Sequence, residues 1–156
     1  MTFFERIKII ARNFKSRKYG YFGDYDNWRI AQQYCAGYEA ENILEKIKTS
    51  TLEVKNGKAV FERDSVIFEK IQYSWPLLSA LMWVAALNKG RINVIDFGGS
   101  LGSSYFQNKQ YLDTLSSVKW NIIEQAPFIK YGQESIQDDR LQFFYSVEDA
   151  IRVNGL

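Results

Sequence analysis

The chain has 156 residues with a net charge of +2, and 46% of its residues are apolar. This length fits one domain, or one domain with a small helical annex, and the apolar fraction excludes wholesale disorder. Because the sequence has no histidine and a single cysteine, Cys35, it excludes imidazole chemistry, an intramolecular disulfide and a multi-cysteine metal site, and it suits the reducing cytoplasm.

The N-terminal segment concentrates positive charge. Residues 1–20 contain six basic side chains and one acidic side chain, Glu5. Apolar side chains recur at helical spacing among these charges and predict a basic amphipathic helix over residues 3–18. Such a helix can make peripheral contact with an anionic membrane or dock on a protein, and docking is favoured because apolar stripes usually face a core. The interrupting charges argue against a signal peptide.

The segments that follow predict helices, turns and one hairpin. After a glycine-punctuated aromatic loop, Asp26 or Asn27 is expected to cap a helix that begins near Trp28. A second helix is expected over residues 40–49. Residues 52–61 contain an Asn-Gly pair between two short apolar runs, which predicts a β-hairpin with a type I′ turn.

A further helical region is expected between this hairpin and the sheet. Asp64 is expected to begin it, with a kink at Pro76, and Trp75-Pro76 resembles the first turn of a buried helix over the apolar run that follows. The apolar run over residues 77–87 is too short to span a bilayer. The Asn-Lys-Gly sequence at residues 88–90 is typical of a C-terminal cap.

Strands and helices alternate in the rest of the chain. The expected order is strand 92–95, helix 102–115, strand 118–123, helix 128–136, strand 141–145 and helix 147–153. This alternation implies right-handed crossovers and a parallel sheet. The predicted fold class is α/β: a helical annex with a small hairpin over residues 1–90, then a partial Rossmann-like parallel sheet with helices on both faces over residues 91–156.

The most informative segment is Asp96-Phe97-Gly98-Gly99-Ser100-Leu101-Gly102, where a strand turns sharply into a helix. Glycines permit unusual dihedral angles and let a ligand approach the backbone closely. A dinucleotide site needs G-x-G-x-x-G, but aligning Gly99 and Gly102 with its last two glycines puts Phe97 at the first. The segment instead resembles the acidic-x-Gly-x-Gly-x-Gly turn of class I methyltransferases, with Ser100 in place of the middle glycine.

This resemblance implies that S-adenosylmethionine is the cofactor. The molecule has no phosphate, and its sulfonium and ammonium groups favour a nearby carboxylate such as Asp96. Glu124 ends the next predicted strand, where an acidic residue can accept both ribose hydroxyls, and Gln125 beside it can reach the adenine. The alternative is that both acids are solvated strand-end carboxylates, but their positions at consecutive strand tips favour a ligand. Residues 146–149 either cap the last helix or face the adenine, and capping is favoured.

Five separate segments also resemble one specific group of proteins. They are Gly23-Asp24-Tyr25 with Trp28, Glu62–Val66, Gln72–Leu78, Asp96–Tyr105 and Trp120–Gln125. In this order they are similar to a family of bacterial methyltransferases often associated with surface-polysaccharide gene clusters. The resemblance runs from about residue 20 to the end. It implies S-adenosylmethionine binding and methyl transfer to a sugar, a polysaccharide precursor or another small molecule.

Tyr73 completes the set of candidate cofactor contacts. In class I folds the region before the first strand can fold over the cofactor, so Tyr73 is a candidate contact of the methionine moiety. The equally weighted alternative is that Tyr73 and Trp75 are core aromatics of the annex. Arg63 and Asp64 are expected to form an exposed pair that contributes little. No catalytic residue is assigned.

The sequence ends shortly after the third predicted strand, whereas a complete class I fold resembles a sheet of about seven strands. The chain is therefore expected to be shorter than the family's full form, or to be completed by a partner copy at the open edge of the first strand. Three readings stay open: a methyltransferase with a small-molecule or glycan acceptor, a noncatalytic cofactor-binding module, and an interaction domain that forms a homo-oligomer. A nucleic-acid partner is not expected, because the basic charge is confined to one helix.

Overall fold

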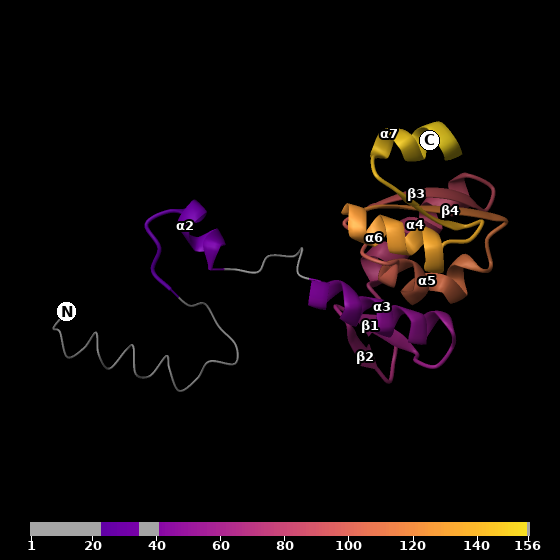
Figure 1. Cartoon of the computed structure of the whole chain (residues 1–156). Helices are drawn as coiled ribbons and strands as arrows, with labels where there is room; N and C mark the ends of the chain where they lie inside the picture. Colours follow the sequence, from indigo (N-terminus) through magenta and orange to yellow (C-terminus); the bar gives the residue numbers. More distant parts are fainter. Residues whose placement is uncertain (1–22, 35–40, 156) are drawn as a thin grey trace. The chain divides into compact units, whose positions relative to one another are not determined.

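The computed structural model describes residues 23–34 and 41–155 (Figure 1). The chain forms two compact units, Met1–Glu39 and Ala40–Leu156. In the first unit, α2 spans Trp28–Gln33, and the side chain of its N-cap Asn27 accepts a hydrogen bond from the Ile30 amide at 3.1 Å. The predicted cap and helix start are confirmed. The helix expected over residues 3–18 and Cys35 lie outside the described residues.

The second unit holds the remaining described elements. They are α3 (Glu41–Lys55), β1 (Phe61–Arg63), β2 (Val66–Phe68), α4 (Trp75–Leu87), β3 (Arg91–Phe97), α5 (Ser103–Leu112), β4 (Ser117–Ile123), α6 (Ala126–Tyr131), the π-helical turn η1 (Gly132–Ile136), β5 (Leu141–Phe144) and α7 (Val147–Asn154). The described residues therefore make a mixed α/β structure with six α-helices and a three-stranded parallel sheet. Residues 41–90, which the sequence assigns to an annex, belong to the same compact unit as the sheet. None of the described helices is long and apolar enough to cross a membrane.

The hairpin expected over residues 52–61 is wrong. Helix α3 continues to Lys55, because Leu52 lies at helical spacing from Leu44 and Ile47 and packs with them against the core. The Asn-Gly pair ends this helix instead of turning a hairpin: the Gly57 amide, at φ +71°, donates to the Val54 carbonyl at 3.0 Å. An Asn-Gly pair is compatible with a hairpin turn and with the C-terminus of a helix. Here the packing of α3 against the core favours the helix.

The observed hairpin joins β1 to β2 through Asp64 and Ser65. These two residues have φ angles of +51° and +64°, and Arg63 pairs with Val66 on either side of them. Two positive φ angles in a two-residue loop are the geometry of a type I′ turn. The sequence does not signal this turn, because neither residue is glycine or asparagine.

The prediction of a helical region that begins at Asp64 is also wrong, because β2 and an irregular stretch occupy residues 66–74. Helix α4 begins at Trp75, and Pro76 lies in its first turn, where a missing amide costs no helical hydrogen bond, so no kink forms. The predicted end of this helix is confirmed. The Gly90 amide, at φ +76°, donates to the Ala85 carbonyl at 2.8 Å.

The sheet has the order β3-β4-β5, and both pairings are parallel, as predicted. Val94 pairs with Trp120, which pairs with Leu141, so these side chains share one face. That face packs against α4, α5 and α6 through buried side chains that include Leu81, Ala85, Tyr105, Phe128 and Ile129. Figure 1 shows α7 on the other side of the sheet, so helices lie on both faces, as expected.

The second face of the sheet carries a row of amide side chains under α7. Asn121, which is 1% exposed, donates to Oδ1 of Asn93 at 2.7 Å and to the Val94 carbonyl at 2.8 Å. Asn154 at the end of α7 donates to Oδ1 of Asn121 and to Oε1 of Gln142, each at 2.7 Å. We call these four side chains (Asn93, Asn121, Gln142 and Asn154) the amide ladder. Their mutual hydrogen bonds offset the cost of burying polar groups between helix and sheet.

Two side chains stabilise the ends of helices: Lys55 links α3 to η1, and Ser146 caps α7. The expected helix over residues 128–136 is α6 followed by η1, and Nζ of Lys55 donates to the carbonyls of Ser135 and Ile136 at 2.8 and 2.9 Å. Ser146 caps α7, because its hydroxyl accepts from the Asp149 amide at 3.1 Å. The interpretation of residues 146–149 as a cap is confirmed.

Candidate functional site

The glycine turn lies between the end of β3 and the start of α5. The Gly98 amide donates to the Ile123 carbonyl at 2.9 Å, which fixes the turn to the end of β4. Gly98 is exposed, has a φ of +73°, and a Cβ atom added there would meet no atom within 4 Å. The backbone of Gly98 therefore faces open space, where a ligand can approach it closely.

The next residues fold back over Asp96. A Cβ atom added to Gly99 would lie 2.6 Å from Cγ of Asp96, so any larger residue there would displace the carboxyl group from its position. Ser100, which replaces the middle glycine of the motif, has a φ of +53°, and Gly102 has a φ of +99°. Ser100 therefore holds the backbone conformation that the motif supplies with glycine, at a cost of about 1–2 kcal/mol.

Asp96 is half-buried at the carboxyl end of β3. Its Oδ2 atom accepts a hydrogen bond from Nε1 of Trp120 at 2.9 Å. Burial raises the pKa of Asp96 above its ordinary value of about 3.8 and the charge of Glu124 raises it further, while the Trp120 hydrogen bond lowers it. The ionised carboxylate is thus held where a cationic group of a ligand would stabilise it.

Glu124 lies at the end of the neighbouring strand, β4. Its Oε2 atom accepts from the Gln125 amide at 2.6 Å, and Gln125 itself is the exposed N-cap of α6. Asp96 pairs with Ile122 and Phe97 with Ile123, so Asp96 and Glu124 both lie at the carboxyl ends of adjacent parallel strands, and the charge of Glu124 raises the pKa of Asp96. The structure brings together the two acids that the sequence selects.

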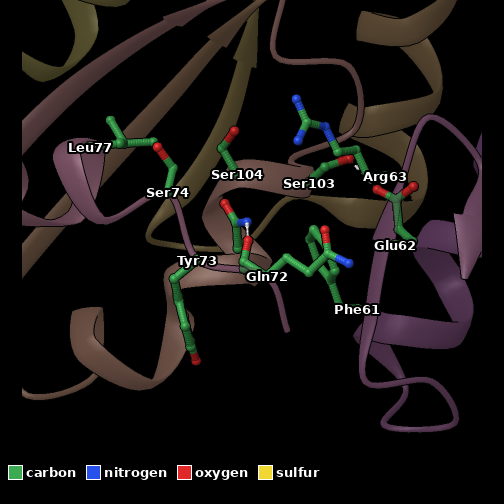
Figure 2. A pocket seen from close by; sticks show the side chains of 10 residues that line it. Phe61, Glu62, Arg63, Gln72, Tyr73, Ser74, Leu77, Ser103 and Ser104 are labelled. Atoms are coloured by element: carbon green, nitrogen blue, oxygen red, sulfur yellow. Dashed lines mark hydrogen bonds between the residues drawn. The ribbon is translucent and has the colours of Figure 1, made fainter. Parts of the chain in front are cut away.

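Two adjoining cavities lie beside the glycine turn. The smaller has a volume of about 290 Å³ and lies between the turn and the hairpin; the larger, of about 520 Å³, continues toward the start of α4 (Figure 2). Both are lined by Glu62, Arg63, Ser103 and Ser104, which we call the shared wall. The smaller cavity is also lined by Ile47, Asp64, Ser65, Asp96, Gly98, Gly99 and Ser100, and the larger one by Phe61, Gln72, Tyr73, Ser74, Leu77 and Gln107.

Glu62 is a site residue that is not among the candidates chosen from the sequence motifs. Its side chain is 2% exposed, and its carboxylate accepts from the hydroxyl of Ser103 at the first turn of α5 and, at 3.4 Å, from that of Ser50 in α3. A charged residue in a three-residue strand gives no periodic signal that would reveal such burial. Its place in the Glu62–Val66 segment of the family resemblance is the one sequence feature that points to it.

Two predicted cofactor contacts, Phe97 and Tyr73, do not line the smaller cavity. The Phe97 side chain is 82% exposed, lies on the sheet face opposite to Asp96 and lines neither cavity. Tyr73 lines only the larger cavity; its ring contacts those of Trp75 and Tyr111 at centroid distances of 5.3 and 5.4 Å and points away from the shared wall in Figure 2. Burial and the nearby Tyr111 raise the pKa of Tyr73.

Arg63 and Asp64 are both exposed, and the structure shows no ion pair between them. No group of three or more His, Cys, Asp or Glu side chains within residues 23–34 and 41–155 is arranged to hold a metal ion. Comparisons of the chain with family models, with curated proteins and with solved structures find no match.

Proposed function

We propose that the chain binds S-adenosylmethionine at the glycine turn and is a class I methyltransferase or the cofactor-binding part of one. The observation that carries the proposal is the open backbone of Gly98, which lies at the carboxyl ends of the same two strands as Asp96 and Glu124. At the carboxyl ends of β3 and β4, a ligand can approach the Gly98 backbone closely. Its ribose and its cationic group can there bind the two acidic side chains.

The arrangement of the sheet supports a Rossmann-like interpretation of the fold. Ligands of open parallel sheets bind outside the carboxyl ends of the strands. Asp96, the glycine turn and Glu124 all lie at the carboxyl ends of β3 and β4, and helices cover both faces of the sheet. In the proposed complex, Glu124 accepts the ribose hydroxyls, Gln125 lies near the adenine, and the methionine end extends from Gly98 toward the smaller cavity.

The larger cavity supports a polar acceptor. Its lining includes the side-chain amides of Gln72 and Gln107 and the hydroxyls of Ser74 and the shared wall, which can bind a molecule rich in hydroxyl groups. This composition agrees with a sugar or another small polar molecule as the methyl acceptor. We keep the cytoplasm as the proposed location, and the peripheral membrane contact of residues 3–18 stays a prediction.

One observation favours the second candidate function, an interaction domain. Helix α4 exposes apolar side chains along its outer face, including Trp83 at 67% and Leu87 at 66% exposure. Among the described strands, β3 pairs only with β4. A second copy that paired with β3 would cover both features and give the homo-oligomer that the sequence suggests.

Calorimetric titration of the folded chain with S-adenosylmethionine and S-adenosylhomocysteine tests the proposal. Saturable binding is expected, and Glu124→Gln should weaken it by about 1–3 kcal/mol through loss of charge-assisted hydrogen bonds to the ribose. Glu134→Gln, at an exposed position of η1, is the matched control and should bind as the unmodified chain does. Absence of binding by a folded chain would contradict the proposal and favour the second candidate function, an interaction domain.

A further inference from the structure

Glu62 is a buried carboxylate without a cationic partner in the part of the chain that the structure describes. Two hydroxyls, those of Ser50 and Ser103, donate to it, and none of the described ion pairs includes it. An ionised carboxylate can accept about four hydrogen bonds, and its burial is costly unless a positive charge compensates it. Glu62 therefore has both the spare acceptor positions and the electrostatic need for a cationic group.

The cavity beside Glu62 has the charge that such a group requires. The smaller cavity is lined by three acidic residues, Glu62, Asp64 and Asp96, and by one basic residue, Arg63. Glu62 and Asp96 come from different parts of the fold, the hairpin and the sheet, and line the same space. A small cation that enters from the glycine turn gains favourable interactions with both carboxylates.

Arg63 supplies the opposite charge next to this position. Its side chain is exposed, lines both cavities and forms no ion pair among the described residues. Figure 2 shows its guanidinium on the side of the cavity where Ser103 and Ser104 lie, directed away from the Glu62 carboxylate. A guanidinium binds a carboxylate through two parallel hydrogen bonds. Adjacent residues of one strand thus offer partners for both charges of an amino acid.

We propose that the hairpin binds the amino-acid end of the ligand, with Glu62 accepting from its α-ammonium and Arg63 donating to its α-carboxylate. This inference rests on the proposed function and extends it, because the hairpin lies outside the parallel sheet. The methionine end then lies along the shared wall, and the methyl group reaches the boundary between the two cavities. Glu62 and Arg63 act in binding and positioning, not in methyl transfer itself.

Three ligands separate the two contacts when their affinities are measured by calorimetry on the full chain. S-adenosylhomocysteine has both charged groups, its decarboxylated analogue keeps only the ammonium, and methylthioadenosine has neither. Glu62→Gln should weaken the first two by about tenfold or more and leave methylthioadenosine unchanged, which corresponds to the loss of one charge-assisted hydrogen bond. Arg63→Gln should weaken S-adenosylhomocysteine alone.

The control is Arg152→Gln, an exposed arginine of α7 that lines neither cavity and should change no affinity. Because Glu62 is buried, its variant can fail to fold; Arg63 is exposed, so its variant then decides the matter. An equal loss for all three ligands would assign Glu62 a purely structural role as the link between hairpin and α5, and unchanged affinities in both variants would also overturn the inference.

The same titrations distinguish the two proposals. If the unmodified chain binds methylthioadenosine and S-adenosylhomocysteine with equal affinity, the result supports the cofactor site and contradicts the contacts of Glu62 and Arg63 with the amino-acid end. If the folded chain binds neither compound, the proposed function and this inference are both overturned.

Discussion

The indole N–H of Trp120 donates a hydrogen bond to Oδ2 of Asp96 at 2.9 Å, so the acid of the glycine turn is positioned from the neighbouring strand. Trp120 is 2% exposed, and its ring packs edge-on against that of Tyr105 at a centroid distance of 5.9 Å. The orientation of the candidate ligand-binding carboxylate is therefore determined by the hydrophobic core beneath it.

Trp120→Phe tests this coupling. Phenylalanine keeps an aromatic ring in the core but removes the donor, so we expect the free energy of unfolding to fall by about 1.5–3 kcal/mol. Urea denaturation measures this change, and S-adenosylhomocysteine titration should show weaker binding. Trp83→Phe is the control, because Trp83 is 67% exposed on α4 and its replacement should change stability by less than about 0.5 kcal/mol. Equal effects of the two substitutions would contradict the assignment.

Asp96→Asn should change the pH dependence of stability. Because the pKa of Asp96 is raised in the folded state above its ordinary value of about 3.8, the folded state binds this proton more tightly than the unfolded state does. The unmodified chain therefore loses stability as the pH rises from about 3.8 through the raised pKa, and asparagine cannot lose a proton.

The variant should accordingly gain stability relative to the unmodified chain across that pH window and keep a constant difference above it. Urea denaturation of both chains in a series of buffers measures the difference. A difference that is flat, or that falls with rising pH, would show that Asp96 is not held in an environment that disfavours its charge.

Gly98→Ala should separate backbone strain from ligand contact. Gly98 and Gly57 have nearly the same φ, +73° and +71°, and in both an added Cβ would meet no atom within 4 Å. Alanine at either position should therefore lower the free energy of unfolding by a similar amount, about 1–2 kcal/mol. Only Gly98→Ala should weaken S-adenosylhomocysteine binding, by about tenfold or more, because its methyl group enters the space proposed for the ligand. Unchanged affinity would remove the glycine turn from the site.

The amide ladder should show energetic coupling between α7 and the sheet. Asn121→Ala and Asn154→Ala each leave buried amide groups without partners, so each should lower the free energy of unfolding by about 1–3 kcal/mol. A double-mutant cycle measured by urea denaturation should give a coupling energy of about 0.5 kcal/mol or more. Strict additivity would mean that the two amides contribute independently.

The sequence predicts the parallel sheet well because its signals are local and agree. The alternation of strands with helices, Gly90 after α4 and Ser146 before α7 each indicate the boundary that the structure shows. The same is true of Asp96 and Glu124, because consecutive parallel strands bring their carboxyl ends to one edge.

The β1–β2 hairpin and the cavity wall around Glu62 depend on tertiary contacts that local sequence patterns do not indicate. Asn56-Gly57 indicates a turn but not whether a helix or a strand precedes it, and the packing of Leu52 decides for a helix. The burial of Glu62 depends on Ser103, which is 41 residues away in the sequence. Phe97 follows Asp96 directly, yet strand alternation directs its side chain to the opposite face.

Lys55 at the end of α3 binds the carbonyls of Ser135 and Ile136, which lie 80 and 81 residues further along the chain. Such a contact closes a long loop, and its entropic cost is repaid only after β3, β4 and β5 have paired. We therefore expect α3 to dock late in folding and to open early in unfolding. The hairpin packs against α3 and α5. The cavity walls that the hairpin provides should therefore form when α3 docks and be lost when α3 detaches.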